Sequence, residues 1–152
     1  MDKEGNPESE PKKERKKKEK KMKDNVLFPT ALTEKNREDL RSMKNKLGWP
    51  TIWAMLRDGM KDFTKNKPWT MGFAFENPPN LFKIKHNKKT KKKIMIQSEY
   101  TQYNLSLDPE TKEIMEGALK ELEESNGKVS RRTFIFSMIR WWMDSGHKKY
   151  LS

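Results

Sequence analysis

The residues best suited to specific chemistry are three polar side chains that alternate with apolar ones in a short run. The run is Gln102-Tyr103-Asn104-Leu105-Ser106-Leu107. Asn and Gln amides can form paired hydrogen bonds with adenine edges in the DNA major groove. The chemistry that this run offers is therefore hydrogen bonding rather than bond breaking.

Residue patterns typical of enzymes are absent from the sequence. His86 and His147 are the only histidines, neither has an obvious partner, and there is no cysteine. The sequence contains no P-loop, no Gly-rich dinucleotide fingerprint and no His-Glu-x-x-His motif. We therefore expect a protein that is not an enzyme and that uses no metal and no cofactor.

The polar run is followed by two predicted helices. Asp108-Pro109 is a favoured helix start, and Asn126-Gly127 is a favoured helix end. Ser130 can cap the second helix. Both helices have apolar stripes at helical spacing, formed by Ile114, Ala118 and Leu122 with Met115 and Leu119 beside them, and by Ile135, Met138, Ile139 and Trp142. The predicted order is strand, helix, helix.

Such a unit cannot bury its own apolar faces. The second helix is apolar nearly all round, because Phe134, Phe136, Trp141 and Met143 extend its stripe, and such a helix is normally buried on several sides. A lone strand also leaves half of its backbone groups unpaired. Both problems disappear if two units pair strand to strand and pack their second helices together.

The pattern resembles the ribbon-helix-helix family of DNA-binding proteins, of the Arc and MetJ type. The residues that carry the resemblance are Gln102-Tyr103-Asn104-Leu105, Leu107, Gly127, Ser130-Arg131 and Ile135. In that family two strands form an antiparallel ribbon that enters the major groove. The resemblance implies that Gln102, Asn104 and Ser106 face the bases, while Tyr103, Leu105 and Leu107 face the core. Ser106 stands where the family often has arginine, which weakens any expectation of guanine reading there.

The resemblance also implies a phosphate site at the start of the second helix, at Ser130, Arg131 and Arg132. Free N–H groups, the positive end of the helix and two guanidinium groups converge there, which suits an anion. Thr51 occupies the matching place in an earlier stretch, and we assign it the same role.

That earlier stretch, Val26–Phe63, looks like a first copy of the same unit. Thr33 and Thr51 are predicted helix caps, and Gly48 ends the first of the two helices. Gly48-Trp49-Pro50-Thr51 aligns without gaps to Gly127-Lys128-Val129-Ser130. The predicted apolar positions are Leu40, Met43 and Leu47 in the first helix, and Ile52, Met55, Leu56, Met60 and Phe63 in the second.

The first copy differs where sequence reading would occur. Its outward strand positions are Leu27, Pro29 and Ala31, none of which can donate a hydrogen bond to a base from its side chain. It either reads little sequence or serves as a structural partner. The copies can pair with each other as an intramolecular pseudo-dimer, or each can pair with its equivalent in a homodimer. We favour the pseudo-dimer, because pairing within a chain has no concentration cost. Two copies in one chain are similar to the tandem ribbon-helix-helix proteins that assist relaxases on conjugative plasmids.

Composition favours an anionic partner. The 152 residues carry a net charge of +12, with 37% charged and 32% apolar residues, which suits nucleic acid or an acidic membrane surface. No apolar run reaches the length of a signal peptide or membrane span, so we expect no membrane partner and a cytoplasmic, nucleoid-associated protein. Residues 1–24 are predicted to be a disordered basic arm, either simply solvated or following phosphates.

The segment 65–99 is predicted to be a basic linker that contains a hairpin. Phe73-Ala74-Phe75 and Leu81-Phe82-Lys83-Ile84-Lys85 flank Asn77-Pro78-Pro79-Asn80, a strong turn signal. Ile94-Met95-Ile96 is either a further strand or a lead-in to the ribbon. The lysine run between them is either a solvated loop or a set of phosphate contacts that read no sequence: Lys88, Lys89, Lys91, Lys92 and Lys93.

We therefore expect a mainly α fold with short β-strands, built from two tandem ribbon-helix-helix units at 25–64 and 100–146, with a tail at 147–152. The expected function is sequence-specific binding of double-stranded DNA. A transcriptional repressor, a plasmid or phage relaxosome or partition factor, and an antitoxin all fit the resemblance. The alternatives are a structural scaffold protein and an RNA-binding protein with non-specific nucleic-acid affinity.

Overall fold

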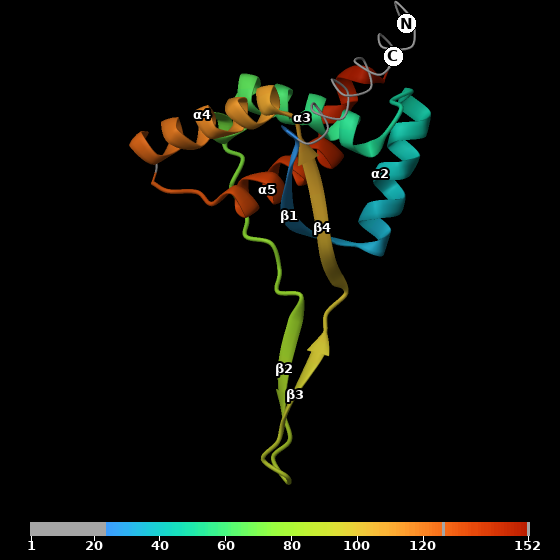
Figure 1. Cartoon of the computed structure of the whole chain (residues 1–152), viewed down its shortest axis with the longest axis vertical. Coiled ribbons are helices and arrows are strands. Elements are labelled where there is room, and N and C mark those ends of the chain that lie inside the picture. Colours follow the sequence, from blue (N-terminus) through green and yellow to red (C-terminus); the bar gives the residue numbers. More distant parts are fainter. Residues whose placement is uncertain (1–23, 126, 152) are drawn as a thin grey trace, which may run out of the picture.

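The computed structural model describes residues 24–125 and 127–151, and the expected basic arm lies outside them except for Asp24. Within these ranges the chain is mixed α/β, with four α-helices and two small antiparallel sheets (Figure 1). The elements are β1 (Val26–Thr33), α2 (Glu34–Leu47), α3 (Ile52–Asn66), η1 (Pro68–Met71), β2 (Phe82–His86), β3 (Lys93–Gln97), β4 (Tyr100–Leu107), α4 (Pro109–Ser125), α5 (Arg131–Asp144) and η2 (Gly146–Tyr150).

The helix ends follow the capping residues of the sequence. Thr33 and Asn36 form a capping box at the start of α2, with Thr33 Oγ1 accepting from Asn36 N at 3.0 Å. Thr51 Oγ1 accepts from Ala54 N in α3, and Ser130 Oγ accepts from Thr133 N in α5. Gly48 ends α2 with φ +89°, in the left-handed region that favours glycine.

The ribbon is the sheet formed by β1 and β4, which pair antiparallel within one chain. Pro29 lies opposite Asn104, and Leu27 lies opposite Ser106. Each strand of the ribbon leads into two helices, so the order strand, helix, helix occurs twice. Since facing residues of an antiparallel pair point to the same side of the sheet, the expected outward positions of the two strands share one face.

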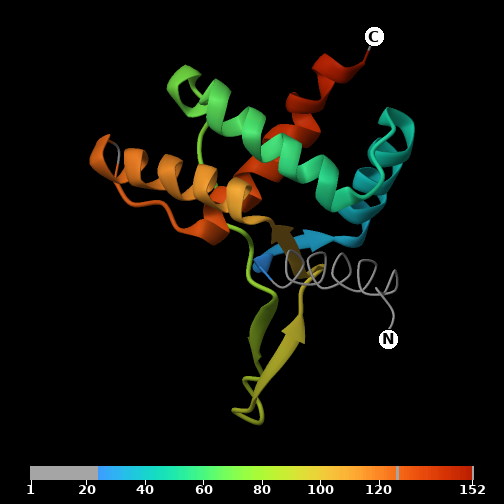
Figure 2. The ribbon, with the colours of Figure 1, turned by 45° about the horizontal axis from the view of Figure 1, so that its top comes forward.

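The core lies between the ribbon and the helices. α3 and α5 cross each other above the ribbon (Figure 2). Gly59 permits their close approach, because a Cβ atom there would lie 3.1 Å from the Trp142 ring. Phe63 of α3 packs edge-on against Phe134 of α5, with ring centroids 5.1 Å apart. The expectation that the second helix of the unit is buried on several sides is confirmed, since seven residues of α5 are buried.

Aromatic residues after α3 close one side of this core. Phe73 and Phe75 pack against Phe63, with ring centroids 5.7 and 6.3 Å away. The buried Ser137 Oγ accepts a hydrogen bond from Glu76 N at 3.0 Å, which fixes the chain at that point. Residues 73–80 therefore pack on the helical body, without regular secondary structure.

Only one of the two strand runs expected for the hairpin forms a strand, because Leu81-Phe82-Lys83-Ile84-Lys85 corresponds to β2 whereas Phe73-Ala74-Phe75 is not in a strand. β2 pairs with β3, and its turn lies at residues 87–92 rather than at Asn77-Pro78-Pro79-Asn80. Phe73-Ala74-Phe75 was expected to be a strand. Instead, Phe73 and Phe75 pack on the core, where their rings are removed from water. The alternative that Ile94-Met95-Ile96 forms a strand is confirmed. The hairpin projects away from the helical body, roughly in line with β4 (Figure 1).

The end of the chain packs on the body. Tyr150 in η2 lies edge-on to Trp49, with ring centroids 4.8 Å apart, and its hydroxyl donates to Asp62 Oδ2 at 3.0 Å. The expected separate tail is therefore part of the folded body up to Leu151. Across the residues that the structure describes, no helix combines the length and apolar character needed to cross a bilayer.

Candidate nucleic-acid interface

The outer face of the ribbon presents the two amide side chains singled out by the sequence. Gln102 and Asn104 are both exposed, while Leu105 and Leu107 are buried on the opposite face. Gln102 Nε2 donates to Asn104 Oδ1 at 3.0 Å. The pair therefore leaves the Gln102 carbonyl free to accept and the Asn104 amino group free to donate, which matches the donor and acceptor on an adenine edge.

Ser106, the third expected base contact, is not open at the surface. It is 3% exposed, because Arg57 of α3 covers it. Arg57 Nε donates to Ser106 O at 2.8 Å, and its Nη2 donates to Ser106 Oγ at 3.1 Å. The matching position in β1, Ala31, is also buried. The exposed residues of the outer face are therefore Gln102 and Asn104 in β4 and Leu27 and Pro29 in β1.

Leu27 and Pro29 of β1 complete this face. Leu27 is 54% exposed and Pro29 is also exposed. Neither side chain can form a hydrogen bond, so the ribbon has one polar strand and one apolar strand. The expected difference between the outward positions of the two strands is thus present at the exposed surface itself.

The free edge of β4 is covered by three side chains from α2 and α3. Arg37 Nη2 donates to Gln102 O at 2.8 Å, Trp53 Nε1 donates to Asn104 O at 3.0 Å, and Arg57 donates to Ser106 O. These carbonyls point away from β1, where an unprotected edge would invite pairing with another chain. The three donors also bring two guanidinium groups to the border of the outer face.

None of these three donors, Arg37, Trp53 and Arg57, was among the expected site residues. A signal for asymmetry was available in the alignment of the two copies. It matches Trp53 to Arg132 and Arg57 to Phe136, so the edge donors of the first copy are not repeated in the second. No described side chain donates to the outward carbonyls of Leu27, Pro29 and Ala31 in β1.

Tyr103 anchors the inner face of the ribbon beside these donors. Burial raises the pKa of the Tyr103 phenol, against smaller opposing effects of a hydrogen bond with Trp53 and the charge of Arg37. The Arg37 guanidinium carbon lies 5.3 Å from the centre of the Tyr103 ring. Tyr103 therefore stays neutral at physiological pH and helps to hold Arg37 in place.

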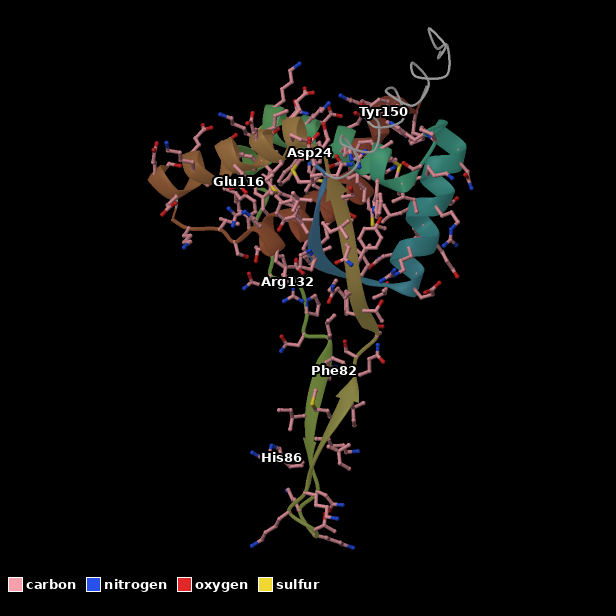
Figure 3. The ribbon with its side chains drawn as sticks, viewed as in Figure 1. Asp24, Phe82, His86, Glu116, Arg132 and Tyr150 are labelled. Atoms are coloured by element: carbon pink, nitrogen blue, oxygen red, sulfur yellow. The ribbon has the colours of Figure 1, made fainter. Side chains whose placement is uncertain are left out.

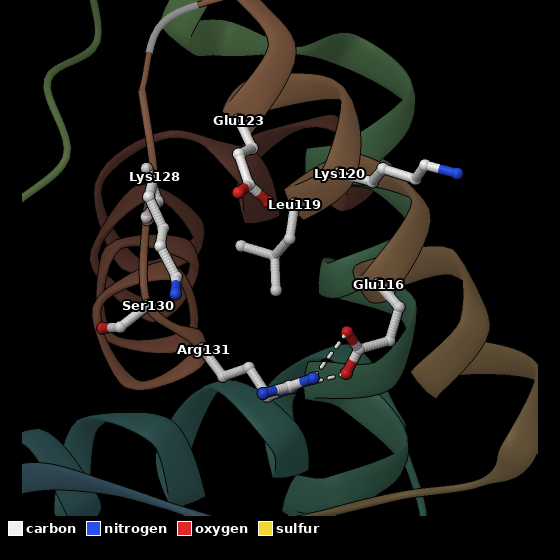
Figure 4. Close-up of a pocket in the computed structure, with 8 residues that line it drawn as sticks. Glu116, Leu119, Lys120, Glu123, Lys128, Ser130 and Arg131 are labelled. Carbon is white, nitrogen blue, oxygen red and sulfur yellow. Dashed lines mark hydrogen bonds and ion pairs between the residues drawn. The ribbon is translucent and has the colours of Figure 1, made fainter.

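At the start of α5, one expected phosphate contact is already paired. Arg131 forms two hydrogen bonds with the Glu116 carboxylate, one of them from Nη2 to Oε2 at 2.9 Å (Figure 4). Hydrogen bonding to Glu116 raises the pKa of Arg131. Glu123 lines the same pocket with Lys128 and Ser130. This helix start is therefore a mixed-charge site, less favourable to a phosphate than the sequence indicated.

The start of α3 is more favourable to an anion. Thr51 caps the helix, and a shallow pocket beside it is lined by Arg41 and Lys44 without a carboxylate. Thr51 accepts from Ala54 N and Met55 N, so the preceding N–H groups of the first turn lie outside the hydrogen bonds of the helix. This geometry suits Thr51 as the stronger of the two expected phosphate sites.

The remaining expected phosphate contacts lie toward the hairpin. Arg132 is exposed, on the side of the body from which the hairpin projects (Figure 3). All five lysines of the expected run are exposed in the hairpin turn and the start of β3: Lys88, Lys89, Lys91, Lys92 and Lys93. The fold thus separates the five hairpin lysines from Thr51 and Ser130 rather than gathering all the cations at one place.

No group of three or more His, Asp or Glu side chains suited to a metal occurs in the described part of the chain. Compared with known protein families, with curated proteins and with solved structures, the chain has no match.

Proposed function

We propose that this protein binds double-stranded DNA by inserting the ribbon into the major groove, as a ribbon-helix-helix protein whose two units form a pseudo-dimer within one chain. The observation that carries the proposal is the intrachain pairing of β1 with β4. In its register, Gln102 and Asn104 lie exposed on one face, while the helices cover the other. Two-stranded ribbons of this kind fit the major groove.

The charge around the ribbon supports the same function. Arg37 and Arg57 border the outer face, and Arg41 and Lys44 lie at the start of α3. Contacts of such groups with phosphates set the position of a protein on DNA, while base-edge contacts supply specificity. In this scheme Thr51 is the principal helix-start phosphate site, and Ser130 with Arg132 is the second.

The two strands have different tasks in this proposal. Gln102 and Asn104 read adenine-containing steps, and Leu27 and Pro29 make apolar contact with thymine methyl groups. The target is consequently asymmetric, in contrast to the palindromes bound by symmetric dimers. A repressor and a plasmid or phage accessory factor both use such binding, and we propose these roles for the protein rather than a catalytic one.

The proposal is tested by selecting duplexes from a random-sequence library with the full chain and then measuring affinity for the selected duplex and for a random one. Asn104→Ala should weaken binding to the selected duplex by about 1–3 kcal/mol and leave binding to random DNA almost unchanged. Asn45→Ala, an exposed asparagine on α2, is the matched control and should alter neither affinity.

An equal loss on both duplexes for Asn104→Ala would refute base reading by this residue. Failure to enrich any sequence, with binding that depends only on salt, would leave the ribbon without a reading role. Enrichment of an inverted repeat would instead indicate ribbons formed between two chains.

A further inference from the structure

The β2–β3 hairpin exposes groups that the proposed ribbon does not use. It has large apolar side chains on both faces, and Met95 is 66% exposed and Ile84 62% exposed. Its other exposed apolar residues are Phe82, Ile94 and Ile96. An isolated two-stranded hairpin is only marginally stable in water, and such a concentration of apolar surface on a projecting element is typical of a binding site.

The hairpin is nevertheless a well-formed element. Asn87 N donates to Lys92 O at 3.0 Å, and Asn87 Oδ1 accepts from Lys89 N at 2.9 Å, which closes the turn. At its base, Ser98 N donates to Leu81 O and Ser98 Oγ donates to Asn80 O, both at 2.8 Å. The arm is thus held at both ends by hydrogen bonds, and Ser98 Oγ also accepts from Tyr100 N at 3.1 Å, where the hairpin meets β4.

Charge identifies the kind of partner. Residues 77–98 contain seven lysines and neither aspartate nor glutamate. Two copies of the hairpin would repel each other, whereas a polyanion complements them. Lysines and apolar residues also share each face: Ile94 lies opposite Lys85 on one face, and Lys93 lies on the other face with Met95, two residues along the same strand. A membrane-binding element would need one continuous apolar face, so nucleic acid fits better.

The position of the hairpin indicates where on DNA it would lie. The eight residues from Tyr100 back to Lys93 are separated by seven steps, which span about 23 Å at the rise of a β-strand. The major groove is only about 12 Å wide. Because the hairpin continues roughly in the direction of β4 (Figure 1), an arm attached to a ribbon in the major groove reaches past the neighbouring phosphate backbone.

We propose that the β2–β3 hairpin is a second DNA-binding element, an arm that lies in the minor groove on one side of the site bound by the ribbon. The lysines contact the phosphates along the groove, and Ile84 and Met95, which lie opposite each other on one face of the hairpin, contact its floor, as apolar wedges do in minor-groove proteins. This inference rests on the proposed function of the ribbon. Since the hairpin occurs once per chain, it extends the bound site in one direction only.

The test is hydroxyl-radical footprinting of the full chain on the selected duplex, with equal flanks on both sides. The wild type should protect the minor groove on one flank only, and shortening that flank should weaken binding about tenfold or more. Exchanging Lys88, Lys89 and Lys92 for glutamine should remove the flank protection, keep the site preference and reduce the salt slope by about 2 to 3. Ile84→Ser with Met95→Ser should also remove the flank protection.

The matched control exchanges Lys46, Lys65 and Lys148 for glutamine, since these lysines are exposed on the helical body. It should retain the one-sided footprint. A footprint limited to the ribbon's site, or an equal loss of flank protection in the control, would overturn the proposal for the arm while leaving the proposed function of the ribbon intact. Tighter binding to duplex RNA or to phosphatidylserine vesicles than to the selected DNA would overturn it as well. Absence of any DNA binding would overturn both proposals.

Discussion

The guanidinium group of Arg57 connects the N-terminal half of the chain to the C-terminal half by hydrogen bonds. Arg57 lies on α3, and its guanidinium group donates to the backbone and the hydroxyl of Ser106 on β4, 4.0 Å from Asp108 Oδ1. Ser106 is buried beneath it. Buried acceptors that lose a charged donor keep the full cost of their desolvation. Arg57 therefore contributes to the stability of strand β4 as well as to that of its own helix, α3.

Replacing Arg57 with methionine tests that role. Arg57→Met keeps most of the apolar stem but removes both donors, and should lower the free energy of unfolding by about 1–3 kcal/mol. Denaturant unfolding measures the change. Lys46→Met, at an exposed position of α2, should change stability by less than about 0.5 kcal/mol. An equal effect of both substitutions would show that the Arg57 hydrogen bonds contribute nothing.

Ser137 is a second residue whose effect extends beyond its own helix. Its buried hydroxyl bonds to both backbone groups of Glu76, at 3.0 Å to the nitrogen and 3.3 Å to the oxygen. Ser137→Ala should cost about 1–2 kcal/mol and speed amide hydrogen exchange at Glu76. Ser42→Ala, exposed on α2, is the control. Unchanged exchange at Glu76 would rule out the anchoring role.

At the scale of elements, the start of α4 contains a titrating group. Burial alone would raise the pKa of Asp108, but hydrogen bonds from Thr111 and the backbone, with the charges of Arg57 and Lys61, outweigh it and lower the pKa. Since the folded pKa is below the unfolded one, the unfolded chain takes up the proton first as the pH falls. The stabilisation is therefore present above the ordinary carboxyl range, near pH 4, and is lost below it.

Asp108→Asn should consequently reduce stability at pH 7 and flatten its decline between about pH 5 and pH 2. Thermal unfolding across this range provides the measurement. Glu124→Gln, at the exposed end of the same helix, should leave the pH profile unchanged. A variant that keeps the wild-type slope would show that Asp108 does not contribute to the acid sensitivity.

On the scale of the whole molecule, the two halves share one core. α3 and α5 contact each other, and the buried cluster includes residues from both halves, such as Leu40 and Leu122. Neither half encloses its own apolar surface. We therefore expect the described body to unfold as one cooperative structure rather than as two independent units joined by a linker.

Leu40→Ala in α2 and Leu122→Ala in α4 should each destabilise by about 2–5 kcal/mol and shift a single unfolding transition. Far-UV circular dichroism and tryptophan fluorescence should give coincident midpoints for both variants. Two separate transitions, with each substitution affecting only one, would contradict a shared core.

Solution mass provides another test at this scale. If β1 and β4 pair within the chain, light scattering should give the mass of one chain, 18.1 kDa, at all concentrations. A mass twice as large, falling on dilution, would indicate ribbons that exchange strands between chains.

Much of the local structure was predictable from the sequence, because its causes lie within a few neighbouring residues. Thr33, Thr51 and Ser130 cap helices, and Gly48 ends one, by hydrogen bonds and backbone conformations that short segments determine. The alternation of Gln102, Asn104 and their apolar neighbours likewise places the amides on one face of a strand. The hairpin strands were only partly foreseen, because a turn signal at residues 77–80 does not reveal that the preceding aromatics pack on Phe63.

The tertiary structure decided which of these residues are available for binding. Ser106 has the right type and spacing for base contact, but Arg57, distant in sequence, reaches across from α3 and buries it. Arg131 is similarly engaged by Glu116, while Arg41 and Lys44 gather at the start of α3. Whether a polar side chain is open, paired or covered depends on what packs beside it, and sequence spacing contains little information about contacts between elements far apart in the chain. The sequence by itself determined the ribbon strand 102–107, the helices that follow it and the alternation that places Gln102 and Asn104 on one face. The packing of α2 and α3 against β4 determined that these two amides remain open on the ribbon while Ser106 does not.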